Sequence, residues 1–341
     1  MTYDEIIKNA RVALGGKLCR ACDECNGRAC RNMIPGPGAK GVGDTAMRNY
    51  DAWRQVRVKM DTICTYRLPD MGVEMFGRHF SYPFFAAPVG AVNIHFGEKY
   101  DDKQYNDIMV KACAEAGIAA FTGDGVLEQV VPMACEAISR NGGTGIPTIK
   151  PWDAATVRQK MQYATNCGAM AIAMDIDAAG LPFLRNSNPP AGSKGVDELR
   201  EIARLAGRPF ILKGIMTVRG AEKAVEAGAA AIVVSNHGGR VLDQCQATAE
   251  VLEEIAVAVN GRCKVLVDGG IRSGVDVFKA LALGADGVLI CRPMVVAAFG
   301  GGEDGVKCYI QKIASELQDT MEMCGASSLA EITRDMVASP F

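Results

Sequence analysis

The chain has 341 residues, of which 49% are hydrophobic, and its formal net charge is −2. This composition is typical of a globular protein with a large core, and the balanced charge argues against nucleic acid or an anionic membrane as partner. No apolar run has the length of a membrane span, and residues 1–5 lack the basic-then-apolar order of a signal peptide. We therefore expect a cytoplasmic protein.

Residues 1–80 read as an N-terminal extension with a predicted helix at 45–59 and a cysteine-rich loop. Because no low-complexity linker follows it, we expect the extension to pack on the domain formed by residues 81–341. The chain has 13 cysteines, an odd number that argues against a disulfide framework. Four of them lie close together in the loop, at Cys19, Cys22, Cys25 and Cys30.

The spacing of these four cysteines leaves three interpretations open. Thiolates at such intervals can ligate an iron–sulfur cluster such as [4Fe–4S], or a zinc ion, or they can remain without metal. Three cysteines at intervals of three are more typical of cluster loops, whereas two separate pairs would favour zinc. The cluster is therefore the leading interpretation.

From residue 113 onward the chain repeats one pattern four times: a helix end, a glycine and an apolar strand. The glycines are Gly117, Gly168, Gly228 and Gly284, each placed where a helix needs a left-handed cap. The strands are uniformly apolar, as parallel strands covered by helices are. Four further strands are predicted at 83–87, 146–150, 209–213 and 264–268. Eight strands separated by helix-sized gaps predict a (βα)8 TIM barrel.

Chemistry in such barrels lies at the carboxyl ends of the strands. His237 and Arg240 follow the sixth predicted strand, in the stretch Ser-Asn-His-Gly-Gly-Arg at 235–240. A base beside a fixed cation suits removal of a proton from a substrate whose carboxylate the arginine holds. Asp175, at the end of the fourth strand, is a natural orienting partner for His237.

Two further sets of strand-end residues predict a site for an anionic group. Gly269 and Gly270 offer backbone amides, and Arg272 and Arg292 supply guanidinium donors, in the loops where barrels commonly hold a phosphate. Lys213 ends an apolar strand, where a lysine can form a Schiff base or neutralise an anion beside a cofactor.

Four segments carry a resemblance to a known family: Lys-Gly-Ile at 213–215, the stretch at 235–240, Asp-Gly-Gly-Ile-Arg at 268–272, and Asp-Val-Phe-Lys-Ala-Leu-Ala-Leu-Gly-Ala at 276–285. Together they resemble the FMN-dependent 2-hydroxy acid oxidases and dehydrogenases, such as glycolate oxidase, lactate oxidase and mandelate dehydrogenase. A weaker likeness covers residues 50–175. The resemblance implies oxidation of a lactate-like or glycolate-like 2-hydroxy acid to a 2-oxo acid, and a homo-oligomer.

The resemblance also implies residue roles. His237 is the general base with Asp175 as its partner, Arg240 grips the substrate carboxylate, and Lys213 lies beside N1 of the flavin. The remaining residues that would contact FMN are Pro88, Val89, Gly90, Thr122, Ser235, Asp268, Gly269, Gly270, Arg272, Cys291 and Arg292.

Several positions depart from the family pattern. The family has a second carboxylate-binding arginine just after the fourth strand, but no arginine follows Asp175 here until Arg185. Its tyrosines are also missing, since 33–36 reads Met-Ile-Pro-Gly and 149–152 reads Ile-Lys-Pro-Trp. Lys150 and Arg185 are the candidates to replace the missing arginine at the substrate. Asp124, where the family has small hydroxyl residues, is expected to add negative charge near the flavin.

Two alternatives to 2-hydroxy acid oxidation stay open. One keeps the barrel and FMN but makes the protein an isomerase or a reductase of another substrate, which the missing arginine and tyrosines favour. The other is a non-catalytic flavin or metal sensor, which has no need of the base His237. If the cysteines hold a cluster near the flavin, we expect electrons to pass singly to a carrier rather than to dioxygen.

Overall fold

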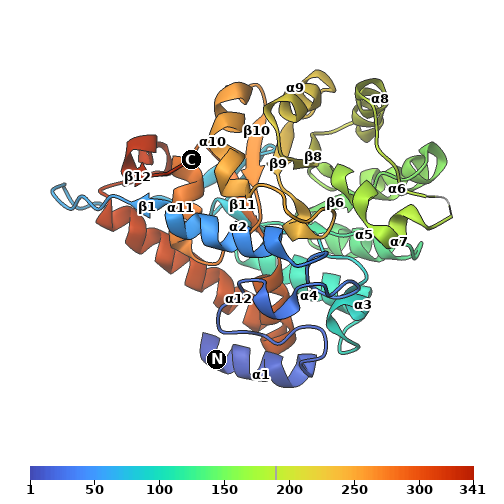
Figure 1. The fold of residues 1–341 in the computed structure, drawn as a ribbon, viewed down its shortest axis with the longest axis horizontal. Coiled ribbons are helices and arrows are strands. Elements are labelled where there is room, and N and C mark those ends of the chain that lie inside the picture. The colour runs from blue at the N-terminus through green and yellow to red at the C-terminus, as the bar shows by residue number, and fades with distance from the viewer. Residues whose placement is uncertain (189) are drawn as a thin grey trace.

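The computed structural model describes residues 1–188 and 190–341, and its centre is a closed barrel of eight parallel strands (Figure 1). Their order around the barrel is β10-β11-β4-β5-β6-β7-β8-β9. The strands are β4 (Phe84–Ala86), β5 (Ala120–Thr122), β6 (Gly145–Ile149), β7 (Ile172–Asp175), β8 (Phe210–Ile215), β9 (Ala231–Val234), β10 (Lys264–Val267) and β11 (Gly287–Ile290). The predicted TIM barrel is confirmed.

At least one helix follows every barrel strand. Those on the outside of the barrel are α4 (Asp102–Glu115), α5 (Val130–Arg140), α6 (Ala154–Asn166), α8 (Val196–Ala206), α9 (Val218–Glu226), α10 (Thr248–Val259), α11 (Gly274–Ala282) and α12 (Arg292–Met323). The short helices α3 (Val92–Phe96) and α7 (Pro182–Arg185) lie at the mouth of the barrel. The four glycines of the repeat all have positive φ, as predicted for left-handed caps. Within the described ranges, no helix is long and apolar enough to cross a membrane.

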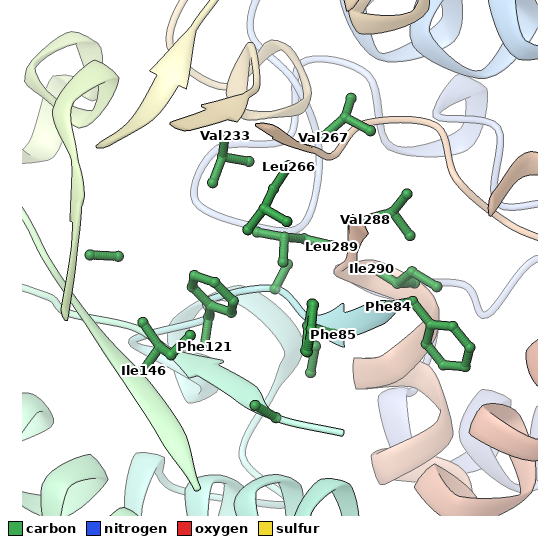
Figure 2. Packing of buried hydrophobic residues seen from close by; sticks show 14 of the residues in the cluster. Phe84, Phe85, Phe121, Ile146, Val233, Leu266, Val267, Val288, Leu289 and Ile290 are labelled. Carbon is green, nitrogen blue, oxygen red and sulfur yellow. The ribbon is translucent and has the colours of Figure 1, made fainter. Parts of the chain in front are cut away.

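The interior of the barrel is filled by large side chains from alternate strand positions. Figure 2 shows Phe85, Phe121, Leu266 and Leu289 turned toward one another, and all four are at most 2% exposed. The rings of Phe85 and Phe121 meet edge to face, with their centroids 6.4 Å apart. Because these side chains fill the interior of the barrel, the residues at its mouth are supported from below by a closely packed core.

The N-terminal extension consists of α1 (Tyr3–Leu14), the 3-10 turn η1 (Arg28–Cys30), α2 (Asp44–Gln55) and the hairpin of β2 (Val73–Met75) and β3 (Arg78–Phe80). Helix α1 begins with a capping box between Thr2 and Glu5 and lies against α12 (Figure 1), where the Tyr3 and Tyr309 rings are 5.5 Å apart. The helix predicted at 45–59 ends earlier, because the chain turns into β1 (Arg57–Val58), which pairs with β12 (Val337–Ala338).

Helix α2 is hydrogen-bonded to the loops that follow β9 and β10. The side-chain amides of Asn49 and Asn236 donate to each other at 2.7 and 2.9 Å, and both side chains are buried. Trp53 Nε1 donates to the carbonyl of Gly269 at 2.8 Å. At Gly270 the fit is so close that a Cβ atom would lie 2.1 Å from the Asn49 carbonyl oxygen. The extension therefore shapes two loops at the barrel mouth.

We predict that Gly270→Ala is far more damaging than Gly228→Ala, although the two glycines have nearly equal φ, +84° and +85°. A Cβ at Gly228 meets nothing within 4 Å, so this variant should lose only the about 1 kcal/mol of left-handed strain. Gly270→Ala adds a clash with α2, and should lose about 3 kcal/mol or more of the free energy of unfolding. Urea unfolding of both variants measures the difference, and equal losses would show that the approach of α2 is unimportant.

Candidate active site

A pocket of about 310 Å³ opens at the carboxyl ends of the barrel strands. Most of the residues predicted from the sequence line it. They are Pro88, Val89, Gly90, Lys150, Lys213, His237, Arg240, Asp268, Gly269, Gly270, Arg272, Cys291 and Arg292. Residues that were predicted at strand ends therefore lie in one pocket, although some of them are more than 200 positions apart in the chain.

Four predicted residues do not line the pocket. Thr122, Asp175 and Ser235 are at most 2% exposed and lie behind its wall. Arg185 is exposed at the end of α7, so the structure does not support it as a substitute for the missing arginine. The short helix instead directs Phe183 toward the pocket.

His237 is held in an unusual backbone conformation at the start of the 3-10 turn η3 (His237–Gly239). Its φ is +56°, in the left-handed region that a residue other than glycine rarely adopts. Its backbone N–H donates to Ser235 Oγ at 3.1 Å. Its ring Nδ1 lies 3.0 Å from Asp177 Oδ1 and 3.5 Å from Asp175 Oδ1. Asp177 is thus the nearer partner, and Asp175, the predicted one, stands behind it.

Asp177 was not among the residues predicted from the sequence. It lies in the 3-10 turn η2 (Ile176–Gly180), which directly follows β7. Space for it comes from Gly214, with φ +104°, at an irregularity between β8 and β9, where a Cβ would lie 2.6 Å from the Asp177 Cβ. The signal in the sequence was the pair of an aspartate two residues beyond Asp175 and a glycine directly after Lys213.

Asp175 is the centre of a buried charge network. Its carboxylate accepts hydrogen bonds from Lys150 Nζ at 2.5 Å and from Lys213 Nζ at 3.0 Å. Burial alone would raise the pKa of Asp175, but His237, Lys150 and Lys213 outweigh it and hold this pKa well below its usual range. Burial and the charge of Asp175 raise the pKa of Asp177. Asp175 is the carboxylate that stays ionised.

The same network fixes the charge states of His237 and Lys213. Burial lowers the pKa of His237 well below its usual value. The charge of Asp175 raises this pKa, but the charges of Lys213, Lys150 and Arg240 lower it further. The imidazole is therefore neutral and able to accept a proton. Burial opposes the charge of Lys213, but Asp175 and Asp268 outweigh it and raise the pKa of the ammonium. A lysine that stays protonated suits neutralisation of an anion rather than a Schiff base.

Arg240 is fixed by the N-terminal extension. Its Nη1 donates to the carbonyls of Gly36 at 2.5 Å and Gly38 at 2.9 Å. Burial lowers the pKa of Arg240 to about 10, so the guanidinium remains charged at neutral pH. Residues 35–37 also line the pocket, and the loop that replaces the family's tyrosine segment therefore forms part of its wall.

Asp124 does not add the unpaired negative charge that was expected beside the flavin. Its carboxylate forms a buried ion pair with Lys160 and accepts from Trp152 Nε1 at 2.7 Å and from the Lys150 backbone N–H at 2.9 Å. The charge of Asp124 is therefore neutralised within the protein. The expectation was wrong because the sequence did not indicate that Lys160, on α6, reaches the mouth of the barrel.

His95 is a second pocket residue that sequence reasoning missed. It lies on α3, and its Nδ1 accepts a hydrogen bond from the Gly36 N–H at 3.1 Å. Burial, with the charges of Arg240 and Lys150 nearby, lowers the pKa of His95 to about 3. Its neutral ring lies beside Phe183, with centroids 5.9 Å apart. No motif in the sequence pointed to His95, because only the fold places α3 against the 33–38 loop.

The two ends of the pocket differ in chemistry. One end has apolar side chains, among them Ile94, Val126 and Phe183. The other end has the glycine loop after β10 and the cations Arg272 and Arg292. Three buried polar atoms around the pocket have no hydrogen-bond partner in the described part of the chain: Thr122 Oγ1, Asp268 Oδ1 and Arg272 Nη2. Since buried polar atoms are normally paired, these atoms fit a polar ligand such as the phosphate-bearing FMN.

The fold and this pocket define a class of protein: a β/α-barrel oxidoreductase with a phosphate-bearing cofactor beside a buried base. The FMN-dependent dehydrogenase family matches residues 36–195 and 185–339, and the chain belongs to this family. It is 33% identical over 332 residues to the peroxisomal (S)-2-hydroxyacid oxidase GLO3 of Arabidopsis thaliana, covering 86% of this chain and 88% of the relative.

Solved structures agree with this assignment. Mandelate oxidase with (S)-2-phenylpropionate superposes with a TM-score of 0.78 at 26% identity, covering 99% of this chain and 97% of the other. Lactate oxidase from Pediococcus acidilactici, at 23% identity and a TM-score of 0.79 over 98% of this chain and 93% of the other, shows the shared fold. The cofactor that the resemblance implied, FMN, is the cofactor of the family.

We predict that His95 makes folding pH-dependent. Its pKa is about 3 in the folded protein against an ordinary value of 6.5, so the unfolded chain binds the proton first, and stability is lost as the pH falls below 6.5. Between pH 7.5 and 5 this group should cost about 2 kcal/mol. In His95→Gln the loss of unfolding free energy over that range should be smaller by this amount. His79→Gln, at an exposed residue, is the control and should match the wild type; an unchanged slope in His95→Gln would contradict the prediction.

Proposed function

We propose that this protein oxidises a 2-hydroxy acid to a 2-oxo acid with FMN as the electron acceptor in the pocket. The observation that carries the proposal is the placement of a neutral His237, hydrogen-bonded through Nδ1 to Asp177, in the same pocket as Arg240 and the cationic glycine loop. The names of the relatives, (S)-2-hydroxyacid oxidase and mandelate oxidase, support the same substrate class.

Arg240 is the residue that we assign to the substrate carboxylate. Its Nη1 is occupied by the carbonyls of Gly36 and Gly38, which leaves its Nη2 and Nε donors for the substrate. Two carbonyls that fix one nitrogen also fix the plane of the guanidinium, so the fork is oriented before substrate binds. The apolar end of the pocket, with Ile94, Val126 and Phe183, fits a 2-hydroxy acid with an apolar side chain.

His237 receives a proton in this reaction. With Nδ1 directed at Asp177, its Nε2 is the free atom that accepts the proton from the substrate, and the ionised Asp175 stabilises the imidazolium that results. Bound FMN supplies the redox chemistry, by taking up the two electrons that the substrate loses. Lys213, a buried ammonium beside Asp268 and Asp175, would supply positive charge to the bound cofactor.

We also propose that the flavin passes its electrons to a carrier, that the protein is a homo-oligomer and that it is cytoplasmic. The first of these proposals concerns the re-oxidation of the flavin, and it depends on what the cysteine loop binds.

We predict that 2-hydroxy acids with apolar side chains bleach the bound flavin when oxygen is excluded, because FMN then keeps the two electrons. His237→Gln should retain FMN but reduce it about 10²- to 10⁴-fold more slowly, since the proton acceptor is lost. Stopped-flow absorbance of the flavin measures both rates. A variant that reduces FMN at the wild-type rate would refute the role of His237. Failure of lactate, glycolate and mandelate alike to bleach bound FMN would favour an isomerase, a reductase or a sensor.

We predict that Lys150 contributes to binding of the substrate carboxylate. Its Nζ is anchored by Asp175 on the wall of the pocket, so Lys150→Ala removes a fixed cation and should raise KM about tenfold or more. Arg185→Ala is the matched control, because its side chain lies exposed outside the pocket, and its KM should not change. A lower kcat with an unchanged KM in Lys150→Ala would restrict this lysine to positioning Asp175.

A further inference from the structure

A second cavity, of about 200 Å³, lies between the N-terminal extension and the barrel. All four cysteines of the loop line it: Cys19, Cys22, Cys25 and Cys30. They are free thiols, each partly buried. No residue from another part of the chain has to be borrowed to complete a set of four sulfur ligands.

The spacing of the four cysteines distinguishes between metals. Structural zinc sites usually take their thiolates from two separate pairs of cysteines. Here three cysteines follow one another at intervals of three, Cys19, Cys22 and Cys25, and Cys30 follows them. This spacing is more typical of a loop that holds an iron–sulfur cluster.

The wall of the cavity supplies the positive charge that a thiolate-ligated cluster needs. Arg272, Arg292 and Lys312 line it together with the cysteines. Arg292 Nη1 lies 3.8 Å from Cys30 Sγ as a hydrogen-bond donor, and Arg272 Nε donates to the backbone carbonyl of Cys25 at 2.7 Å.

We propose that this cavity binds a [4Fe–4S] cluster ligated by Cys19, Cys22, Cys25 and Cys30. The proposal is independent of the substrate assigned above, because it rests on a different cavity. Arg272 and Arg292 line both cavities, so the cluster lies next to the cationic end of the FMN pocket. Its hydrogen-bond donors would be the guanidinium groups that also line the cationic end of the FMN pocket.

The loop that carries the ligands continues directly into the substrate pocket. Gly38 packs so closely on the turn of η1 that a Cβ would lie 1.7 Å from the Cys30 carbonyl oxygen. The carbonyls of Gly36 and Gly38 then hold Arg240. A cluster in the cavity therefore also braces the segment that positions the substrate arginine.

The test is a metal analysis of the full-length protein, purified without oxygen and reconstituted with iron and sulfide. We expect four iron and four acid-labile sulfide per chain, a broad visible absorption band beyond that of FMN, and an electron paramagnetic resonance signal after reduction with dithionite. Cys22→Ser and Cys30→Ser, made separately, should each lose iron and this signal. Cys64→Ser, at an exposed cysteine outside the cavity, should retain both.

Three results would overturn the proposal: stoichiometric zinc in place of iron, a wild-type protein that holds FMN but no metal after reconstitution, or full iron content in both Cys22→Ser and Cys30→Ser. FMN content and circular dichroism of each variant show whether it is folded. Flavin bleaching by 2-hydroxy acids is measured on the same samples, so a failure of the proposed function is seen separately from a failure of the cluster proposal.

Discussion

The buried carboxylate of Asp175 is the constraint on which the site depends. Taking this charge out of water is costly unless cations and hydrogen bonds compensate for it. The compensation comes from the ends of neighbouring strands: Lys213 is its register partner on β8, and Lys150 follows β6. An error of one residue in the register of any of these strands would leave a charge unpaired in the interior. The register that packs the barrel is therefore also the one that assembles the charges. The neutral state of His237 follows first from burial, with Lys213, Lys150 and Arg240 acting in the same direction.

The sequence predicted the framework well because its signals were local. Uniformly apolar strands, capping glycines and the rule that chemistry lies at strand ends located eight strands and most of the pocket residues. What escaped prediction depended on long-range geometry. Asp177 reaches His237 only because the chain is irregular at Gly214, His95 enters through the packing of α3 on the 33–38 loop, and Asp124 is neutralised by a lysine on the following helix. Contacts between side chains on different helices, strands and loops follow no periodic pattern in the sequence, so they could not be predicted from it.

The N-terminal extension is more than a cover for the barrel. Its helix α2 fixes the loops after β9 and β10 through Asn49 and Trp53, and its Gly36 and Gly38 carbonyls orient Arg240. A division of the chain at residue 80 is thus useful for describing the sequence but does not divide the site. Gly36 and Gly38, whose carbonyls hold Arg240, lie before that boundary, and Arg240 and the base His237 lie after it.

Arg272 and Arg292 stand between two cavities that each attract negative charge. Cations shared in this way make the two cavities thermodynamically linked. Negative charge bound in the cysteine cavity would weaken the attraction of the two arginines for a phosphate in the other cavity, and a bound phosphate would weaken their attraction for negative charge at the cysteines. By reciprocity the two effects on binding would be equal. Such coupling would require no movement of the backbone between the cavities.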